Sequence, residues 1–173
     1  MNLALLFDDD FIAEDRARLT GRRLAHLRSV LKAGTGDQVP VGRVNGRMGM
    51  GEVLRLSDTE AELRVQLTQL PPPALPLTLV LAMPRPKMFR RVLQTCASLG
   101  VKDLWLINSY KVEKSFWQTP WLGDEALQEN LTLGLEQAMD TVMPRVHIRK
   151  LFKPFVEDEL PGLVSGRTAL VAH

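Results

Sequence analysis

Four prolines within residues 71–76 divide this chain of 173 residues into two parts with different patterns. Residues 70–76 read LPPPALP. Proline donates no hydrogen bond to a strand ladder and does not continue a helix, so we expect a short, stiff linker at 71–76. The linker separates a first domain, residues 1–70, from a second domain, residues 77–173.

Before the linker, the pattern predicts one helix among several short strands. The helix is expected at about 20–32, where Leu24, Leu27 and Leu31 recur at helical spacing. The pair Asn45-Gly46 favours the positive φ angles of a tight hairpin turn. Strands are expected at 38–44, 51–56 and 60–67. This arrangement predicts a small β-barrel.

After the linker, strands alternate with helices. The apolar run 77–83 is expected to form a strand buried on both faces, and a helix at about 87–99 follows it. Further strands are expected at 101–108, 145–150 and 168–173, with helices at about 124–141 and from Pro154. This order predicts an α/β domain with a parallel sheet and right-handed crossovers.

Composition excludes several classes of protein. With 45% apolar and 24% charged residues, the chain is neither disordered nor collagen-like. The longest apolar runs, 3–7 and 77–83, are far shorter than the roughly 20 residues of a membrane-spanning helix. We expect no secretory leader, because Asp8 to Asp10 follow the first run directly. The single cysteine, Cys96, is expected to be structural, no metal site is expected, and the cytoplasm is the expected compartment.

Positive charge is concentrated in two segments. Residues 16–32 carry six Lys and Arg side chains and no carboxylate, whereas residues 85–114 carry seven against two carboxylates. Such clusters are typical of a surface that meets phosphates. The charge pattern alone fits solvated helix faces equally well.

A functional role is better indicated in the second segment, which begins at the stretch Pro84-Arg85-Pro86-Lys87. It follows a predicted strand and opens a helix, and cations in a first helical turn oppose the helix dipole. That conflict favours a functional role for Arg85, Lys87, Arg90 and Arg91. Elsewhere, Glu136 and Gln137 fit either hydrogen bonding to a base or an ordinary surface role. The tryptophans, Trp105, Trp117 and Trp121, fit either stacking on unpaired bases or packing in the core.

Three segments together resemble the small-subunit (16S) ribosomal RNA uridine N3-methyltransferases, members of the knotted SPOUT class of S-adenosylmethionine enzymes. They read LVLAMPRPKMFRRVLQTCASLGV at 79–101, INSYKVEKS at 107–115 and LEQAMDTVMP at 135–144. In the first domain, His26, the run Val30-Leu31-Lys32, Gly36-Asp37 and the Asn45-Gly46 turn resemble the family's PUA-like RNA-binding domain.

The resemblance implies methyl transfer from S-adenosylmethionine to N3 of a uridine, with ribosomal RNA or the small ribosomal subunit as partner. It implies no membrane contact and a homodimer for the complete protein. No catalytic residue is assigned. The side chains expected to face RNA are Arg22, Arg23, His26, Arg28, Lys32, Arg85, Lys87, Arg90, Arg91, Glu136 and Gln137.

Two departures from the family pattern stand out. The family has an arginine three residues after the position of Gln137, where this chain has Asp140, so a position that resembles an RNA-facing one has the opposite charge. The family's glycine-rich cofactor loop and knot are absent, so we expect a truncated chain that is inactive alone. Only Val171 and His173 are expected to reach the edge of the cofactor site.

Two other functions fit the residues. The first is a paralogue that binds RNA without catalysis. The second is a protein–protein adaptor that uses Phe116, Trp117 and Trp121 as anchors. The salt dependence of RNA binding separates the adaptor from the other two, because phosphate contacts release counterions.

Overall fold

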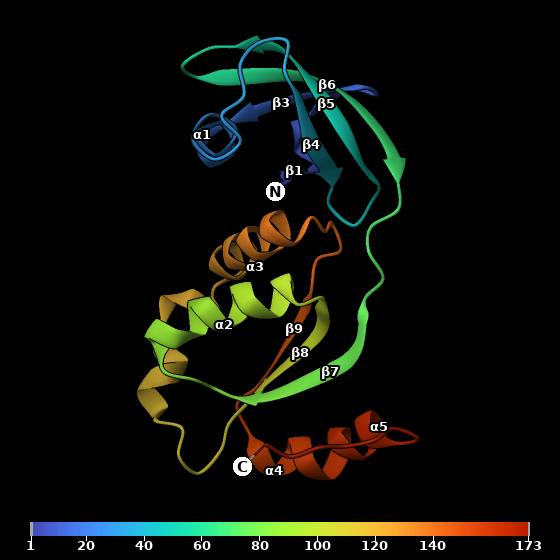
Figure 1. The fold of residues 1–173 in the computed structure, drawn as a ribbon. Coiled ribbons are helices and arrows are strands. Elements are labelled where there is room, and N and C mark those ends of the chain that lie inside the picture. Colours follow the sequence, from blue (N-terminus) through green and yellow to red (C-terminus); the bar gives the residue numbers. More distant parts are fainter. Residues whose placement is uncertain (1, 173) are drawn as a thin grey trace.

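The computed structural model describes residues 2–172 as two sheets, with helices packed between them and beyond the second sheet (Figure 1). The front part holds six strands, a short 3₁₀ turn and one helix. These are β1 (Ala4–Leu6), η1 (Asp8–Asp10), β2 (Phe11–Ala13), β3 (Arg16–Thr20), α1 (Gly21–Ser29), β4 (Gln38–Arg43), β5 (Met48–Leu56) and β6 (Glu60–Gln69).

The front sheet is curled and mixed, with the order β1-β4-β5-β6-β3-β2. Its first pair, β1 with β4, is parallel and the other pairs are antiparallel. Within residues 2–172 no ladder joins β1 to β2, so the predicted small β-barrel is found as an open half-barrel. The helix α1 buries Leu24 and Leu27 in the core of this sheet. The predicted hairpin is confirmed, with Asn45 at φ 57°.

The second part holds three strands, three longer helical segments and two 3₁₀ turns. These are β7 (Leu75–Ala82), α2 (Pro86–Ser98), β8 (Val101–Ile107), η2 (Lys114–Gln118), η3 (Pro120–Leu122), α3 (Asp124–Ala138), β9 (Arg145–Arg149), and the continuous segment α4 (Phe152–Pro154), η4 (Phe155–Glu159) and α5 (Leu160–Val164). In Figure 1, α2 and α3 lie between the two sheets, and α4 to α5 lie on the far side of the second sheet.

The second sheet is parallel as predicted, with the order β7-β8-β9. The predicted fourth strand is wrong, because residues 168–172 form no strand and are exposed, and His173 lies outside the described residues. The expected burial of the first strand is also wrong. Because β7 is an edge strand, Leu75 and Leu77 remain 44% and 47% exposed.

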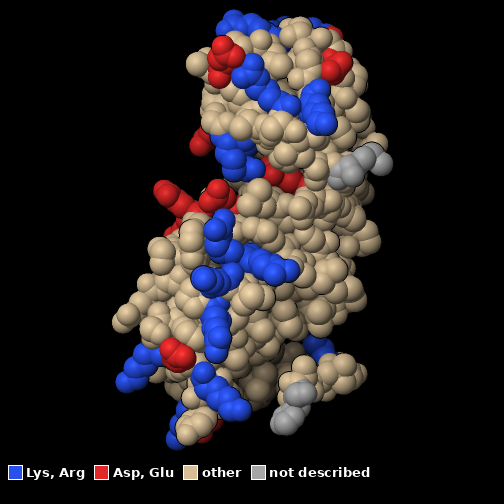
Figure 2. Space-filling view, turned by 60° about the vertical axis from the view of Figure 1, so that its left-hand side comes forward, with Lys and Arg blue, Asp and Glu red and all other residues tan. Residues whose placement is uncertain are grey.

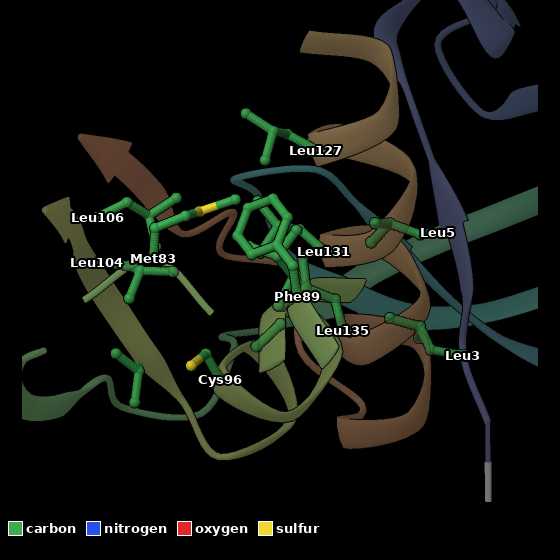
Figure 3. Close-up of a cluster of buried hydrophobic side chains, with 13 residues drawn as sticks. Leu3, Leu5, Met83, Phe89, Cys96, Leu104, Leu106, Leu127, Leu131 and Leu135 are labelled. Carbon is green, nitrogen blue, oxygen red and sulfur yellow. The ribbon is translucent and has the colours of Figure 1, made fainter. Parts of the chain in front are cut away.

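The core of the second part forms where α2 and α3 pack against β8 (Figure 3). Phe89 of α2 lies at its centre and is fully buried. The two helices approach closely at Gly134, where a Cβ atom would come within 2.4 Å of the carbonyl oxygen of Gln94. Cys96 packs in the same cluster, as expected for a structural cysteine, and burial raises the pKa of its thiol.

The N-terminal segment belongs to both cores. Leu3 and Leu5 pack against the helices of the second part, whereas Ala4 and Leu6 pack inside the front sheet. Figure 3 shows Leu3 and Leu5 pointing toward α3. The alternation follows from the two-residue period of extended chain. One strand therefore forms the wall between the two hydrophobic clusters.

A polar joint fixes the two parts to each other as well. The N–H of Asn45 donates to the carbonyl of Thr141 at 2.8 Å, and the hydroxyl of Thr141 donates to the carbonyl of Gly46 at 2.6 Å. The side-chain oxygen of Asn45 accepts from the N–H of Met143 at 2.9 Å. The hairpin of the front part is thus docked on the turn after α3.

Candidate nucleic-acid interface

The loop before α2 is held rigidly at the carboxyl end of the second sheet. Met83, just after β7, is buried, and its N–H donates to the carbonyl of Ile107 at 2.9 Å. The carbonyl of Arg85 then accepts from the N–H groups of Met88 and Phe89 at 2.8 and 3.1 Å. Proline at the first helical position is preorganised for this start.

Four cations project from this loop and the first helical turn. Arg85, Lys87, Arg90 and Arg91 are all exposed. Within residues 2–172, none of them has a carboxylate within ion-pair distance. The buried side chain of Phe89 anchors the helix while its neighbours face solvent. This leaves an uncompensated positive surface at the carboxyl end of the sheet.

The cations of the first basic segment have a different environment. Arg22 donates two hydrogen bonds to the carboxylate of Glu136, at 3.0 and 3.1 Å, and Nδ1 of His26 lies 3.8 Å from the same carboxylate. Arg23 donates to Asp10 at 2.5 Å. The pKa of Asp10 is raised because burial outweighs the hydrogen bond from the Phe7 N–H and the charge of Arg23.

The remaining predicted contacts are divided between interior and surface. Glu136 is only 1% exposed, so its carboxylate serves Arg22 and not solvent. Its neighbour Gln137 is exposed. Arg28 is exposed and pairs with Asp58 at 2.9 Å, and Lys32 is exposed with φ 53°.

Asp140 does not face solvent, contrary to its resemblance to an RNA-facing position. It is 2% exposed, and the ammonium of Lys102 donates to its carboxylate at 2.6 Å and to the carbonyl of Val142 at 2.7 Å. The second carboxylate oxygen accepts from the N–H of Val142 at 2.9 Å. The opposite charge at this position therefore completes an internal network.

The tryptophans have their aromatic surfaces largely occupied. Trp105 is 8% exposed, with the ring of His147 stacked at 4.1 Å and the guanidinium of Arg149 4.8 Å from its centroid. Trp121 is covered by the guanidinium of Arg90 at 4.4 Å, and Trp117 donates to Asn108 at 3.3 Å. These contacts favour packing over base stacking.

A second polar cluster lies on the face of the sheet toward α4. Asp103 accepts from Trp105 at 3.2 Å and from Thr78 at 3.0 Å, and it lies 2.9 Å from Nε2 of His147. Burial alone raises the pKa of Asp103, but these hydrogen bonds outweigh it and lower the pKa below its usual range. Phe155 is buried against Trp105, so the cluster attaches the C-terminal helical segment to the sheet.

The segment expected to form the edge of the cofactor site is exposed to solvent. Val171 is 91% exposed, and His173 lies outside the described residues. Two cavities lie elsewhere: one of about 290 Å³ between the start of α1 and α3, and one of about 450 Å³ beside the Asn45-Gly46 hairpin.

Within residues 2–172, no helix combines the length and apolar character needed to cross a bilayer. In the same residues, no three His, Cys, Asp or Glu side chains gather in an arrangement that could hold a metal ion.

Sequence reasoning missed Asn130, which organises the surface around Arg90. It is fully buried and accepts from Gln94 at 2.9 Å and from Arg90 at 3.4 Å. One signal was present, because Asn130 lies at helical spacing from the apolar Leu127 and Gly134. A polar residue on the buried stripe of a helix indicates a hydrogen-bonded network.

Comparison with known proteins identifies the second part of the chain. Residues 71–173 match the family model described as the RNA methyltransferase domain. A curated relative from Treponema pallidum, "Ribosomal RNA small subunit methyltransferase E", is 28% identical over 158 residues, which is 90% of this chain. The chain spans 59% of that relative's length.

Solved structures show the same fold. One, from Thermotoga maritima, is described as a predicted RNA methyltransferase and superposes with a TM-score of 0.65 at 17% identity, covering 88% of this chain and 67% of that one. A Neisseria gonorrhoeae ribosomal RNA small subunit methyltransferase E bound to S-adenosylmethionine gives a TM-score of 0.63 at 17% identity, covering 86% of this chain and 63% of that one.

Proposed function

The chain belongs to the RNA methyltransferase domain family, and we propose from this premise that its protein methylates N3 of a uridine in small-subunit ribosomal RNA. The family match over residues 71–173 carries the proposal. The name of the Treponema pallidum relative supports the class of RNA, and the bound molecule in the Neisseria gonorrhoeae structure supports S-adenosylmethionine as methyl donor. The proposal includes a cytoplasmic location and a homodimer of the whole protein.

In this proposal, the role of the described residues is to bind the RNA substrate. Figure 2 shows a track of Lys and Arg side chains along one face of both parts of the molecule, with Asp and Glu side chains between the upper and the lower groups. The shared strand and the docked hairpin fix the two parts, so this track has a constant shape. N3 of uracil takes part in base pairing, so an unpaired or extruded uridine is required. Phosphate contacts position such an RNA without reading its sequence.

We assign the main phosphate contacts of the track to Arg85, Lys87, Arg90 and Arg91, because no carboxylate among the described residues lies within ion-pair distance of them. Lys32 and Gln137 remain candidate contacts at exposed positions. We give Arg22, His26 and Glu136 the role of joining α1 to α3. Arg23 and Arg28, each already paired with a carboxylate, contribute less to RNA binding.

The described residues do not fit S-adenosylmethionine at the proposed position. Val171 is exposed, and neither cavity described above lies at the carboxyl ends of β7, β8 and β9. When bound, the donor would supply an electrophilic methyl group. The proposed role of Val171 and His173 is limited to the edge of that site, and no other donor-binding residue is assigned within residues 2–172.

The same observation favours a second candidate function, an RNA-binding module without catalysis. It uses the same basic track and differs only in lacking methyl transfer. RNA binding alone therefore does not separate the two candidates.

The first measurement is the intact mass of the polypeptide isolated from its own cells, compared with 19.4 kDa. That polypeptide is then incubated with a small-subunit ribosomal RNA transcript and radiolabelled S-adenosylmethionine, and the digested nucleosides are analysed for 3-methyluridine. Formation of 3-methyluridine is expected. RNA binding with a steep salt dependence but no label transfer favours the non-catalytic module, whereas salt-independent or absent binding rejects both candidates.

A further inference from the structure

Arg90 differs from the other cations of α2 because its guanidinium is held from two sides. Its Cζ atom lies 4.4 Å from the ring centroid of Trp121, and its Nε donates to the side-chain oxygen of Asn130 at 3.4 Å. A guanidinium within about 6 Å of an indole face is attracted by the ring quadrupole. The plane of the Arg90 head group is therefore set before any ligand arrives.

The support beneath Arg90 is itself rigid. Asn130 is fully buried, donates to the carbonyl of Ala126 at 2.7 Å and accepts from Gln94 at 2.9 Å. The amide thus has partners on both its oxygen and its nitrogen, and a satisfied buried network specifies one orientation. Three elements, α2, η3 and α3, contribute to the support.

The outer edge of the guanidinium remains available. Within residues 2–172, neither terminal nitrogen of Arg90 has a hydrogen-bond partner, and the side chain is exposed. These two nitrogens form the planar fork that matches two oxygens of a phosphate.

A second arginine in the same domain, Arg149, is stacked in a similar way and binds an oxyanion through its Nε and one terminal nitrogen. Arg149 also lies over a tryptophan, Trp105, at 4.8 Å, and it donates to both carboxylate oxygens of Glu159 at 2.5 and 2.7 Å. A stacked guanidinium is thus paired with a bidentate oxyanion inside the molecule. Arg90 has the stacking without the oxyanion.

We propose that Arg90 is a preorganised phosphodiester-binding residue, positioned by Trp121 and Asn130, and that it makes the strongest single phosphate contact of α2. The inference rests on the proposed RNA-binding function and assigns its anchor. Arg91, on the same helical turn, lacks such support and contributes as a mobile point charge. Because the Arg90 side chain is already ordered, it loses less entropy when it binds.

The test measures filter binding of the full chain to a single-stranded fragment of small-subunit ribosomal RNA over a range of salt concentrations. Arg90→Lys keeps the charge but loses the fork and the stacking, so we expect roughly tenfold weaker binding with the same salt slope. Arg91→Lys is the matched control, with an expected loss below about twofold. Arg90→Gln is expected to lower the salt slope by about 0.7, the value for one phosphate contact on single strands.

Trp121→Leu tests the positioning role, because it removes no charge. We expect severalfold weaker binding at an unchanged salt slope, with partial retention in Trp121→Phe. In the double variant with Arg90→Lys the losses should not add, since both act through one contact. Additive losses would instead show that Trp121 and Arg90 act independently, which would overturn the positioning role of Trp121. Circular dichroism of each variant separates these effects from loss of fold.

Two results overturn the inference separately from the proposed function. Equal losses for Arg90→Lys and Arg91→Lys, with steep salt dependence in the unaltered chain, would reject a special role for Arg90 while leaving RNA binding intact. If the unaltered chain binds RNA without salt dependence, or not at all, the proposed function fails and this inference fails with it.

Discussion

The two basic segments of this protein have similar charge and opposite surroundings. Around β3 and α1, each of five arginines faces a carboxylate, whereas the four cations at the start of α2 face none within residues 2–172. The five pairs are Arg16–Glu62, Arg18–Glu60, Arg22–Glu136, Arg23–Asp10 and Arg28–Asp58. Carboxylates therefore occupy these five arginines of the first segment, whereas the four cations at the start of α2 are available to a ligand.

This difference shows that the number of charged residues in a stretch of sequence does not by itself identify a binding surface. Glu136 lies 114 positions from Arg22, so no local count shows that the two neutralise each other. What separates the segments is the presence of a partner in space. A cation paired with a buried carboxylate has its donors occupied, and the pair is costly to break.

The largest expected effect comes from Asp140→Arg. If this position faced RNA, as its resemblance to a family arginine suggests, the substitution would strengthen binding. The structure predicts instead that a second cation beside Lys102, in the interior, lowers the free energy of unfolding by about 4 kcal/mol or prevents folding. Urea unfolding measures this loss. Native stability combined with tighter RNA binding would restore the RNA-facing interpretation.

The next effect is expected from Glu136→Gln, which removes the shared partner of Arg22 and His26. We expect a loss of about 2 kcal/mol in the free energy of unfolding, less than for a fully buried pair because Arg22 is partly hydrated. RNA affinity should stay the same. The control is Glu129→Gln on the exposed side of α3, expected within about 0.5 kcal/mol of the unaltered chain.

Charge reversal in the loop before α2 tests whether the cations without a carboxylate partner bind RNA. The double variant Arg85→Glu, Lys87→Glu should weaken RNA binding by about 10- to 100-fold, or about 1.4–2.8 kcal/mol. Its salt slope should fall by about 1.4, that is 0.7 for each lost contact. Thermal unfolding should change little, because neither side chain forms a hydrogen bond or an ion pair with the residues that the structure describes. Unchanged binding would remove this loop from the interface.

The smallest effect is expected from Arg28→Gln in the first segment. Its partner Asp58 is 94% exposed at the side chain, and such surface pairs contribute about 0–1 kcal/mol to stability. RNA affinity should change by less than about twofold. If filter binding shows a loss as large as that of the Arg85 and Lys87 variant, the division between the two segments is wrong.

The sequence predicted the elements whose patterns are local. The helix at 124–141 and the strand at 101–108 were found within a few residues, because amphipathic spacing and glycine boundaries act over one element. The short strands β1 to β3 were missed, since their partners β4 and β6 lie far along the chain. The segment 168–172 was predicted as a strand from its apolar residues alone, yet it pairs with no neighbour in the structure.

The candidate site divides in the same way. The exposed cations at Arg85 and Lys87 followed from a local conflict with the helix dipole, which the sequence displays directly. The burial of Glu136 and Asp140 depends on Arg22 and Lys102, which come from other elements. The sequence therefore predicted the exposed basic surface at the start of α2. It did not predict which other cations are paired with carboxylates and so are not part of that surface.

The shared N-terminal strand has a consequence for how the chain is made. Leu3 and Leu5 are synthesised before the α3 residues that cover them, because Leu131 and Leu135 follow more than 120 positions later. Contacts of such separation are slow to form because a long loop must close first. During translation, one apolar face of the first strand therefore remains uncovered until α3 has been synthesised. Its second neighbour arrives only after more than 120 further residues have been synthesised.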